Sequence, residues 1–335
     1  MGATPGGDTM QAIVWPRYGS PDVLEFSQVP KPEPVEDQVL VRVVAASLNR
    51  ADLDYLRGWP LFGRLFTGVR GPRTGRLGLD AAGRVEAVGP KAKRFRPGDE
   101  VYGNLTQYGM GAFAEYVCAR EGAFAMKPAA MSMEDAATIP EAAIVALQGL
   151  RLRGGRTIKA GDKVLVNGAS GSVGPFAVQI AKSVGAEVTG VCRHEKMEFV
   201  RSLGADHAID YGSDDFPPRG QGYDWILDIA GKSSILDWRR ALRPTGVYVV
   251  VGGTIRGMLQ ALTLGPLVSR SGGRRMAIMT WWKPFKREDV AVLEKLFADG
   301  KIAPAIDRRY PLSEVPDALR YLDAGHPKGK IVINV

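Results

Sequence analysis

Two hydrophobic patterns divide the chain. In the first third, short segments of alternating apolar and polar residues, such as Gln38–Ala46, are separated by glycine- and proline-rich turns, which is typical of half-buried strands. From Lys163 onward, apolar strands alternate with amphipathic helices, which requires right-handed crossovers and a doubly wound parallel sheet. The pattern therefore predicts an α/β protein with a β-rich domain over 1–128 and an α/β domain over 129–282. The tail, 283–335, is predicted to hold two helices and a strand that return to the first domain.

The glycine-rich stretch after the first strand of the α/β domain is the strongest local motif. Val164–Val166 is wholly apolar, as expected of a parallel strand covered on both faces, and an amphipathic helix follows. Between them stand Gly168, Gly171 and Gly174. Such glycines let the backbone approach a pyrophosphate, and the helix N-terminus offers it free N–H groups. The GxxGxxG spacing leaves a turn of some other α/β domain as an alternative, but the position between strand and helix favours dinucleotide binding.

The residues after the next strand indicate which dinucleotide is bound. An NAD-binding fold usually places Asp or Glu there, where it accepts a hydrogen bond from the ribose 2′-hydroxyl. This chain has Cys192, Arg193 and His194 at the strand end, with Lys196 just beyond. Two cations in place of a carboxylate favour a 2′-phosphate, so the predicted cofactor is NADPH.

Composition and charge change this picture little. The chain has 335 residues, which favours two domains, and 45% hydrophobic against 24% charged residues is typical of a soluble globular protein. The net charge of +8 is compatible with nucleic-acid binding. However, the arginines are scattered along the chain, and their densest groups, 151–156 and 270–275, lack interleaved aromatic residues. A basic surface that attracts an anionic cofactor is therefore the preferred interpretation, and no nucleic-acid partner is predicted.

The lack of a recognisable targeting signal and the small number of cysteines favour a cytoplasmic protein. Residues 1–9 lack the basic and apolar regions of a signal peptide, and no apolar run is long enough to span a bilayer, so no stable membrane anchor is predicted. The two cysteines, Cys118 and Cys192, are far apart and form no CxxC motif, which excludes a disulfide framework.

Seven stretches together resemble the zinc-independent quinone oxidoreductase branch of the medium-chain dehydrogenase/reductase superfamily. They follow the family's order along nearly the whole chain: SLNRAD (47–52), GLDAAGRVEAVG (78–89), FRPGDEVYG (95–103), GAFAEYV (111–117), VLVNGASGSVGPFAVQIAK (164–182), SLGADHAIDY (202–211) and KGKIVINV (328–335). The resemblance implies a GroES-like β-barrel domain, completed by the tail, and a Rossmann cofactor domain. It also implies a homodimer formed through edge strands of the cofactor sheets.

The same resemblance implies that no metal is bound. Zinc-dependent relatives place Cys where this chain has Asn49, and a His-Glu pair where it has Leu79 and Asp80. Leucine cannot ligate zinc, and asparagine is a poor ligand beside thiolate, imidazole or carboxylate. The three histidines are not at ligand spacing either.

Site residues also follow from the resemblance. The pyrophosphate would be wrapped by Ala169, Ser170, Gly171, Ser172, Val173 and Gly174. Arg193, Lys196 and Tyr211 would hold the 2′-phosphate, and Ala230, Gly252 and Gly253 would lie along the nicotinamide and its ribose. Asn49, Tyr55 and Trp281 would line the substrate cleft. One departure is Val145, which stands where relatives carry a hydroxyl, so it is given no polar role.

A metal-free site favours hydride transfer to a small hydrophobic conjugated acceptor, a quinone or an α,β-unsaturated carbonyl. No Lewis acid is then needed, because the developing charge spreads onto an oxygen that requires only a hydrogen-bond donor. Asn49 and Tyr55 are the candidate donors, although each can be purely structural, and Asp52 is expected to cap a helix. Reduction of another carbonyl or of an enoyl thioester, and NADPH binding without turnover, remain alternatives. The apolar stretch 255–268 is interpreted as a lid or a membrane-surface helix.

Overall fold

The chain forms two compact units, each described here by itself. The computed structural model describes residues 8–152, 155–213, 216–217, 220, 222–231, 233–252, 255–270, 273–279 and 282–335. Unit 1 contains the described residues up to Glu141 together with Pro284–Val290 and Ile306–Val335. Unit 2 contains Ala142–Lys283 and Ala291–Ala305.

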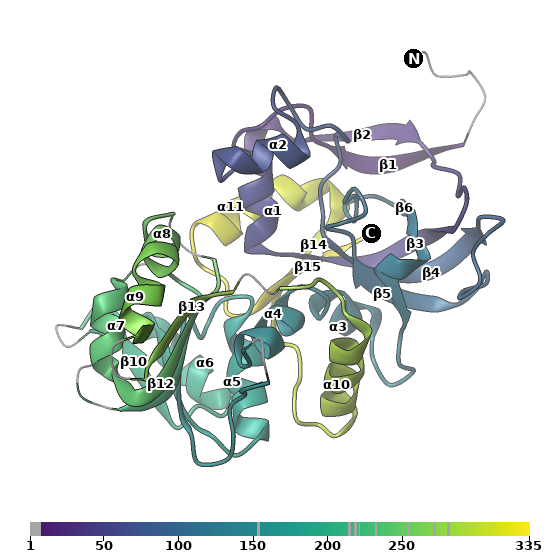
Figure 1. Cartoon of the computed structure of the whole chain (residues 1–335). Coiled ribbons are helices and arrows are strands. Elements are labelled where there is room, and N and C mark those ends of the chain that lie inside the picture. Colours follow the sequence, from purple (N-terminus) through teal and green to yellow (C-terminus); the bar gives the residue numbers. More distant parts are fainter. Residues whose placement is uncertain are drawn as a thin grey trace. The chain divides into compact units, whose positions relative to one another are not determined.

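Unit 1 is built around a mixed, mainly antiparallel sheet (Figure 1). Its strands are β3 (Gln38–Leu48), β4 (Asp80–Val88), β5 (Glu100–Asn104), β6 (Tyr116–Arg120), β7 (Phe124–Met126), β14 (Ile306–Pro311) and β15 (Lys330–Asn334). A separate antiparallel pair is formed by β1 (Thr9–Val14) and β2 (Glu25–Pro30). In β3 the predicted alternation is visible, because Val39, Val41 and Val43 are buried in the core whereas Arg42 is exposed.

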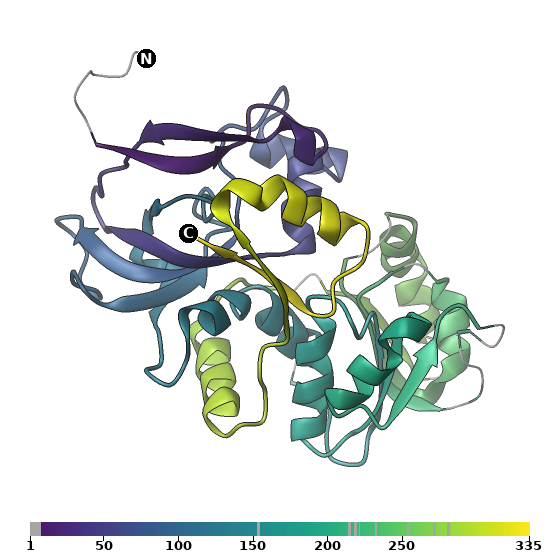
Figure 2. The same cartoon turned by 180° about the vertical axis from the view of Figure 1, so that it is seen from behind.

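The tail supplies two strands to this sheet. β15 pairs antiparallel with β3, Ile331 opposite Leu48, and parallel with β14 (Figure 2). The pairing places Lys330, the first residue of β15, inside unit 1, where it is almost fully buried.

Short helices complete unit 1. They are η1 (Pro21–Val23), α1 (Arg50–Arg57), η2 (Leu61–Gly63), α2 (Arg64–Thr67), η3 (Glu121–Ala123), α3 (Met133–Thr138), η5 (Leu312–Glu314) and α11 (Val315–Asp323). α1 begins as predicted, because the Asp52 carboxylate accepts a hydrogen bond from the Asn49 amide at 2.8 Å, one half of a capping box. It ends at Gly58, whose φ of 61° lies in the left-handed region.

Unit 2 is a parallel sheet of strand order β10-β9-β8-β11-β12-β13, which confirms the predicted doubly wound fold. Its strands are β8 (Lys163–Asn167), β9 (Glu187–Cys192), β10 (His207–Asp210), β11 (Tyr223–Asp228), β12 (Leu242–Val250) and β13 (Arg275–Ile278). The order reverses between β8 and β11, and in such sheets the ligand binds at the carboxyl ends of the strands beside this switch point.

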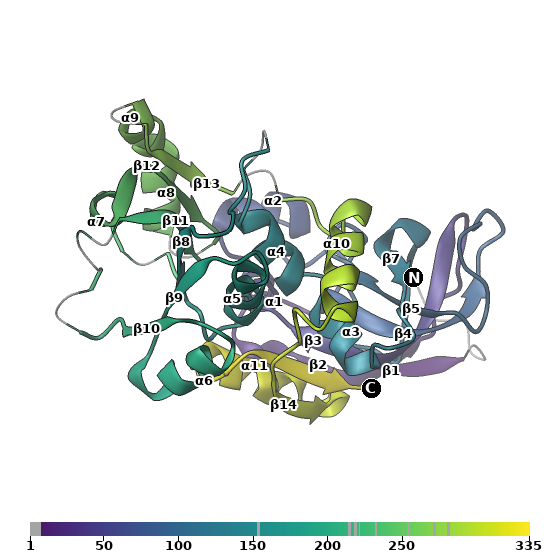
Figure 3. The same ribbon diagram turned by 90° about the horizontal axis from the view of Figure 1, so that it is seen from below.

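The helices of unit 2 connect these strands; Figure 3 shows α5 beside β8 and β9. They are α4 (Ala142–Gly149), α5 (Gly174–Ser183), η4 (His194–Lys196), α6 (Met197–Ser202), α7 (Ile235–Ala241), α8 (Ile255–Thr263) and α9 (Gly265–Arg270); α10 (Arg287–Ala298) lies mostly in this unit. The apolar stretch 255–268 is thus two short helices, α8 and α9. On α8, Leu259 and Leu262 are exposed.

The last two strands of the sheet are joined along the end of β12. β13 pairs with β12 over Arg275–Ile278, and the Met279 amide adds a hydrogen bond to the Val250 carbonyl at 3.0 Å. β12 itself begins at Leu242, which pairs with Tyr223 across a local irregularity.

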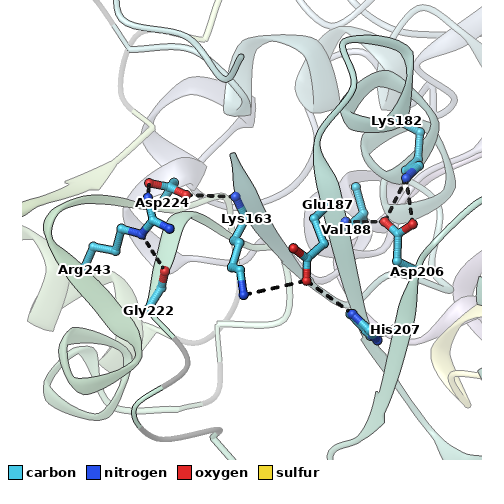
Figure 4. A network of polar contacts seen from close by, with 9 residues as sticks. All are labelled: Lys163, Lys182, Glu187, Val188, Asp206, His207, Gly222, Asp224 and Arg243. Atoms are coloured by element: carbon cyan, nitrogen blue, oxygen red, sulfur yellow. Dashed lines mark hydrogen bonds and ion pairs between the residues drawn. The ribbon is translucent and has the colours of Figure 1, made fainter. Parts of the chain in front are cut away.

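Ion pairs and hydrogen bonds tie the amino ends of these strands together (Figure 4). The Lys163 amide donates to Asp224 at 2.8 Å, and the Asp224 carboxylate also binds the Arg243 guanidinium at 2.7 Å. Glu187 lies 3.3 Å from the His207 ring nitrogen. These contacts join β8 to β12 and β9 to β10 at one edge, opposite the carboxyl ends where the ligand site is expected.

Within the described residues, no helix is long and apolar enough to cross a membrane.

Candidate active site

The predicted glycine turn joins β8 to α5 at the carboxyl edge of the unit 2 sheet. Gly168 has a φ of 91°, which favours glycine, and a Cβ at Gly174 would come within 2.3 Å of the Gly168 carbonyl oxygen. Among the described residues, the amides of Ser170, Ser172 and Val173 have no hydrogen-bond partner. Unpaired amides at the start of α5 form a cradle that suits a diphosphate.

All six residues predicted to wrap the pyrophosphate lie in this turn. The small side chains of Ala169 and Ser170 are buried beneath it, whereas Gly171, Ser172 and Val173 are partly exposed. A Cβ at Gly171 would have no neighbour closer than 3.6 Å, so the space above this glycine is open. The turn is therefore both rigidly supported and accessible to a ligand.

The three residues predicted to bind a 2′-phosphate lie together at the ends of β9 and β10. The Arg193 Nε donates to the Tyr211 hydroxyl at 2.7 Å, and the Tyr211 amide donates to the Cys192 carbonyl at 3.1 Å. Lys196 ends η4, directly before α6, and is buried, whereas Arg193 and Tyr211 are exposed. Burial raises the pKa of the Cys192 thiol to about 11, so this thiol is uncharged at neutral pH.

Ala230 and Gly252 follow β11 and β12 on the same carboxyl edge, where Ala230 is partly exposed and Gly252 is exposed. Gly252 has a φ of 71°. The other residues predicted beside them, Gly253 on this edge and Trp281 in the substrate cleft, lie outside the described residues.

Asp228, which sequence reasoning missed, organises this edge. One carboxylate oxygen accepts from the Asn167 amide group at 2.7 Å and from the Gly231 N–H at 2.8 Å. The other accepts from the Tyr248 hydroxyl at 2.9 Å. Burial raises the pKa of Asp228, while these three donors favour its ionised form. Its position at a strand end, just before Ala230 and Gly231, was the available signal.

In unit 1, Asn49 is held between a buried lysine and a buried aspartate. The Lys330 ammonium donates to the Asn49 side-chain oxygen at 2.6 Å and to the Leu48 carbonyl at 2.9 Å. The Asn49 amide nitrogen donates to Asp80 at 2.9 Å. Both polar atoms of this side chain therefore have partners, and its orientation is fixed.

The group around Asn49, which we call the Lys330 cluster, also contains Asp52, Asn104 and Glu141. The Asn104 amide group donates to Asp80 at 2.9 Å and to Glu141 at 3.0 Å. Burial raises the pKa of both Asp52 and Glu141 to about 8, and it also raises that of Asp80. With three carboxyl groups and one ammonium, the cluster retains protons at neutral pH.

Tyr55, the other predicted donor, lies on α1 close to this cluster. Burial, followed by the charges of Glu141 and Asp52, raises its pKa to about 12, so the phenol keeps its proton. Among the described residues its hydroxyl has no hydrogen-bond partner. The hydroxyl is thus able to donate to a ligand.

The residues at the would-be zinc positions do not fit a metal ion. Leu79 is fully buried and has no donor atom. The Asn49 oxygen is already bound to the Lys330 ammonium, whose positive charge opposes a second cation.

A β-rich unit with a parallel nucleotide-binding unit defines a two-domain, dinucleotide-dependent oxidoreductase. Residues 35–129 match the family model described as alcohol dehydrogenase GroES-like domain, and residues 203–333 match one described as zinc-binding dehydrogenase. The first match confirms the predicted GroES-like domain.

Relatives agree over nearly the whole chain. The chain is 33% identical to an NADPH-dependent alkenal/one oxidoreductase of Arabidopsis thaliana, over 97% of this chain and 79% of the relative. It is 32% identical to a chloroplast envelope quinone oxidoreductase homolog of the same plant, over 98% and 99%. The solved quinone oxidoreductase of Coxiella burnetii is 31% identical, with a TM-score of 0.85 over 98% of this chain and 100% of that one. The chain therefore belongs to the medium-chain dehydrogenase/reductase superfamily, in its quinone oxidoreductase branch, a family of NAD(P)H-dependent oxidoreductases.

Proposed function

We propose that the protein is a zinc-free, NADPH-dependent reductase of quinones or α,β-unsaturated carbonyls. The observation that carries the proposal is the combination of an open glycine cradle in unit 2 with would-be metal positions in unit 1 that cannot hold a metal. Without a Lewis acid, a conjugated acceptor is the easiest hydride acceptor. The relatives named as alkenal/one and quinone oxidoreductases support this substrate class.

The cofactor would be held by residues of unit 2. The amides of Ser170, Ser172 and Val173 would bind the pyrophosphate, and Arg193, Lys196 and Tyr211 the 2′-phosphate. NADPH, when bound, supplies the hydride. Asp228 would act as a positioning residue, because it fixes the turn that carries Ala230 and Gly231. Gly252 and Gly253 would line the same edge.

In unit 1, Tyr55 would donate a hydrogen bond to the acceptor oxygen as negative charge develops there. Its hydroxyl is protonated and has no partner among the described residues, so no existing bond must break first. Asn49 would contribute by fixing the start of α1, the helix that carries Tyr55. Its side-chain amide group is not available to a ligand, because Lys330 and Asp80 hold it.

The reaction is tested by following NADPH consumption with quinones, enones, enoyl thioesters and simple alcohols or ketones. We expect turnover with the first two classes, and transfer of deuterium from stereospecifically labelled NADPH to the β-carbon of an enone. Tyr55→Phe should lower kcat more than it raises KM. Turnover of simple alcohols alone would overturn the proposal, and NADPH binding without any turnover would favour a regulatory protein.

Cofactor preference is tested by titrating NADPH and NADH into the same protein. Charge-assisted contacts to a phosphate contribute about 1.5–3 kcal/mol each, so NADPH should bind at least about tenfold more tightly. Arg193→Ala/Lys196→Ala should reduce the gap, whereas the same change at two exposed residues of unit 1, Arg42→Ala/Lys93→Ala, should leave it unchanged. Equal affinities for NADPH and NADH in the parent protein would refute the preference.

Metal independence, oligomeric state and location complete the proposal. Activity should survive a strong chelator, and elemental analysis should find no stoichiometric zinc.

The exposed edge strand β13 would form a homodimer, which light scattering can measure. We place the protein in the cytoplasm, a location that cell fractionation tests.

A further inference from the structure

A short basic and apolar segment of unit 1 is not used by the proposed reaction. Residues 57–76, which we call the arginine segment, carry five arginines and no acidic residue. In the same segment the large apolar side chains of Trp59, Leu61, Leu65 and Val69 are 46%, 62%, 64% and 64% exposed. Soluble proteins rarely gather several exposed apolar side chains in one short segment without a binding role.

Hydrogen bonds hold the backbone of the arginine segment in place, so its exposed apolar side chains project from a fixed backbone into solvent. The Tyr18 hydroxyl binds both the Gly68 carbonyl and the Thr67 hydroxyl at 2.7 Å. The Arg64 guanidinium stacks on the Tyr18 ring and donates to the carbonyls of Gly58 and Arg57 at 3.2 Å. The structure therefore fixes the chain while leaving the apolar groups in solvent.

The positive charge of the segment is largely uncompensated. Arg57 pairs with Asp323. In the described part of the chain, Arg64, Arg70, Arg73 and Arg76 have no carboxylate partner, and the last three are exposed. A partner of this surface must therefore be anionic, which argues against a second copy of the same basic segment.

We infer that the arginine segment docks the protein on an anionic lipid surface. Exposed tryptophan and leucine side chains enter the boundary between headgroups and acyl chains, while neighbouring arginines bind the anionic headgroups. Nucleic acid would also satisfy the charge, but only Trp59 among the four exposed apolar side chains is aromatic. Leu61, Leu65 and Val69 are aliphatic and cannot stack on bases as the aromatic platforms of single-strand binders do. The inference does not depend on the proposed reaction, since binding is measured without substrate.

Co-sedimentation of the full chain with vesicles tests the docking. We expect binding to phosphatidylcholine vesicles that contain about one third phosphatidylglycerol, little binding to phosphatidylcholine alone, and release as salt is raised to about 0.5 M. Arg70→Gln/Arg73→Gln should weaken binding about twenty-five-fold, about fivefold for each arginine near an anionic surface. Leu61→Ser/Leu65→Ser should weaken it about tenfold by removing apolar burial.

The matched control changes the same net charge elsewhere in unit 1. Arg42 and Lys93 are exposed and lie outside the arginine segment, so Arg42→Gln/Lys93→Gln should bind vesicles within about twofold of the parent. Thermal melting and NADPH titration confirm that each variant is folded. The inference is overturned if anionic vesicles are not bound, if the control loses as much affinity as Arg70→Gln/Arg73→Gln, or if an oligonucleotide displaces the protein from vesicles at equal charge concentration.

Discussion

Buried aspartates stand at strand ends in both units, but their surroundings differ. Asp228 ends β11 and receives hydrogen bonds from three neutral donors, Asn167, Gly231 and Tyr248. Asp80 begins β4 and shares its site with further carboxyl groups and one ammonium. At Asp228, fixed neutral donors stabilise the carboxylate. At Asp80, the stability of the site depends on how many protons the carboxyl groups hold.

This difference has an energetic meaning. A carboxylate with enough neutral donors can remain ionised when buried, because each donor replaces a lost water. A site with more carboxyl groups than cations must keep protons, and its stability then depends on pH. The Lys330 cluster should therefore respond to charge changes and to pH, and the Asp228 site to the loss of a single donor.

The largest expected effect is that of removing the lysine. Lys330→Met leaves the carboxyl groups without the nearby cation and the Asn49 oxygen without its donor, and an uncompensated buried charge costs about 3–5 kcal/mol. Hydrogen exchange of β3 and β15 amides would report the stability of unit 1 separately. Adding Asp80→Asn should recover part of the loss, and the exposed Lys93→Met should cost little. A Lys330→Met protein as stable as the parent would show that the ammonium is not needed.

The second prediction concerns pH. Asp52 and Glu141 have folded-state pKa values raised to about 8, well above those of unfolded chains. Between the two values the folded state holds protons that the unfolded state has released, so the stability of unit 1 falls as pH rises. From pH 6 to pH 7 the two groups together should lower the stability by about 2.5 kcal/mol, measured by urea unfolding.

Glu141→Gln should make this pH dependence shallower, because it removes one of the two titrating groups. A matched substitution of an exposed carboxylate, Glu25→Gln, should leave the slope unchanged. If the slope is the same in the parent and in Glu141→Gln, Glu141 does not contribute to the pH dependence of the stability of unit 1.

The smallest effect is expected at the Asp228 site. Tyr248→Phe removes one of its three donors and should destabilise unit 2 by about 1 kcal/mol. It should also weaken NADPH binding if Asp228 positions the Ala230 turn. Tyr321→Phe loses a similar bond to Asp307 in a partly exposed position and should cost less. An effect on NADPH binding that is equal in both variants would contradict the positioning role.

The residues that sequence reasoning found are those whose role is local. Gly168, Gly171 and Gly174 occur within seven residues between a strand and a helix, so their shared turn could be predicted from spacing alone. The same holds for Asp52, which caps α1 three residues after Asn49. Arg193 and Lys196 could likewise be predicted from their place just after the next strand, and family resemblance added Tyr211.

The contacts that sequence reasoning missed join distant parts of the chain. Lys330 is 281 residues from Asn49, and Tyr248 and Asn167 lie 20 and 61 residues from Asp228. No periodicity indicates which lysine of a terminal strand becomes buried, because this depends on the register between β15 and β3. The sequence allowed Asn49 to be either a donor or purely structural, but for this reason it could not indicate the partners of its side chain.

The position of β15 also has a consequence for synthesis of the protein. A ribosome makes β3, and then all of unit 2, before it makes the strand that pairs with Ala45–Leu48. Until β15 emerges, this part of β3 lacks one neighbour, and the carboxyl groups around Asp80 lack their lysine. We therefore expect the nascent chain to fold unit 2 while unit 1 waits with an open sheet edge, the state in which a growing chain most needs protection by chaperones.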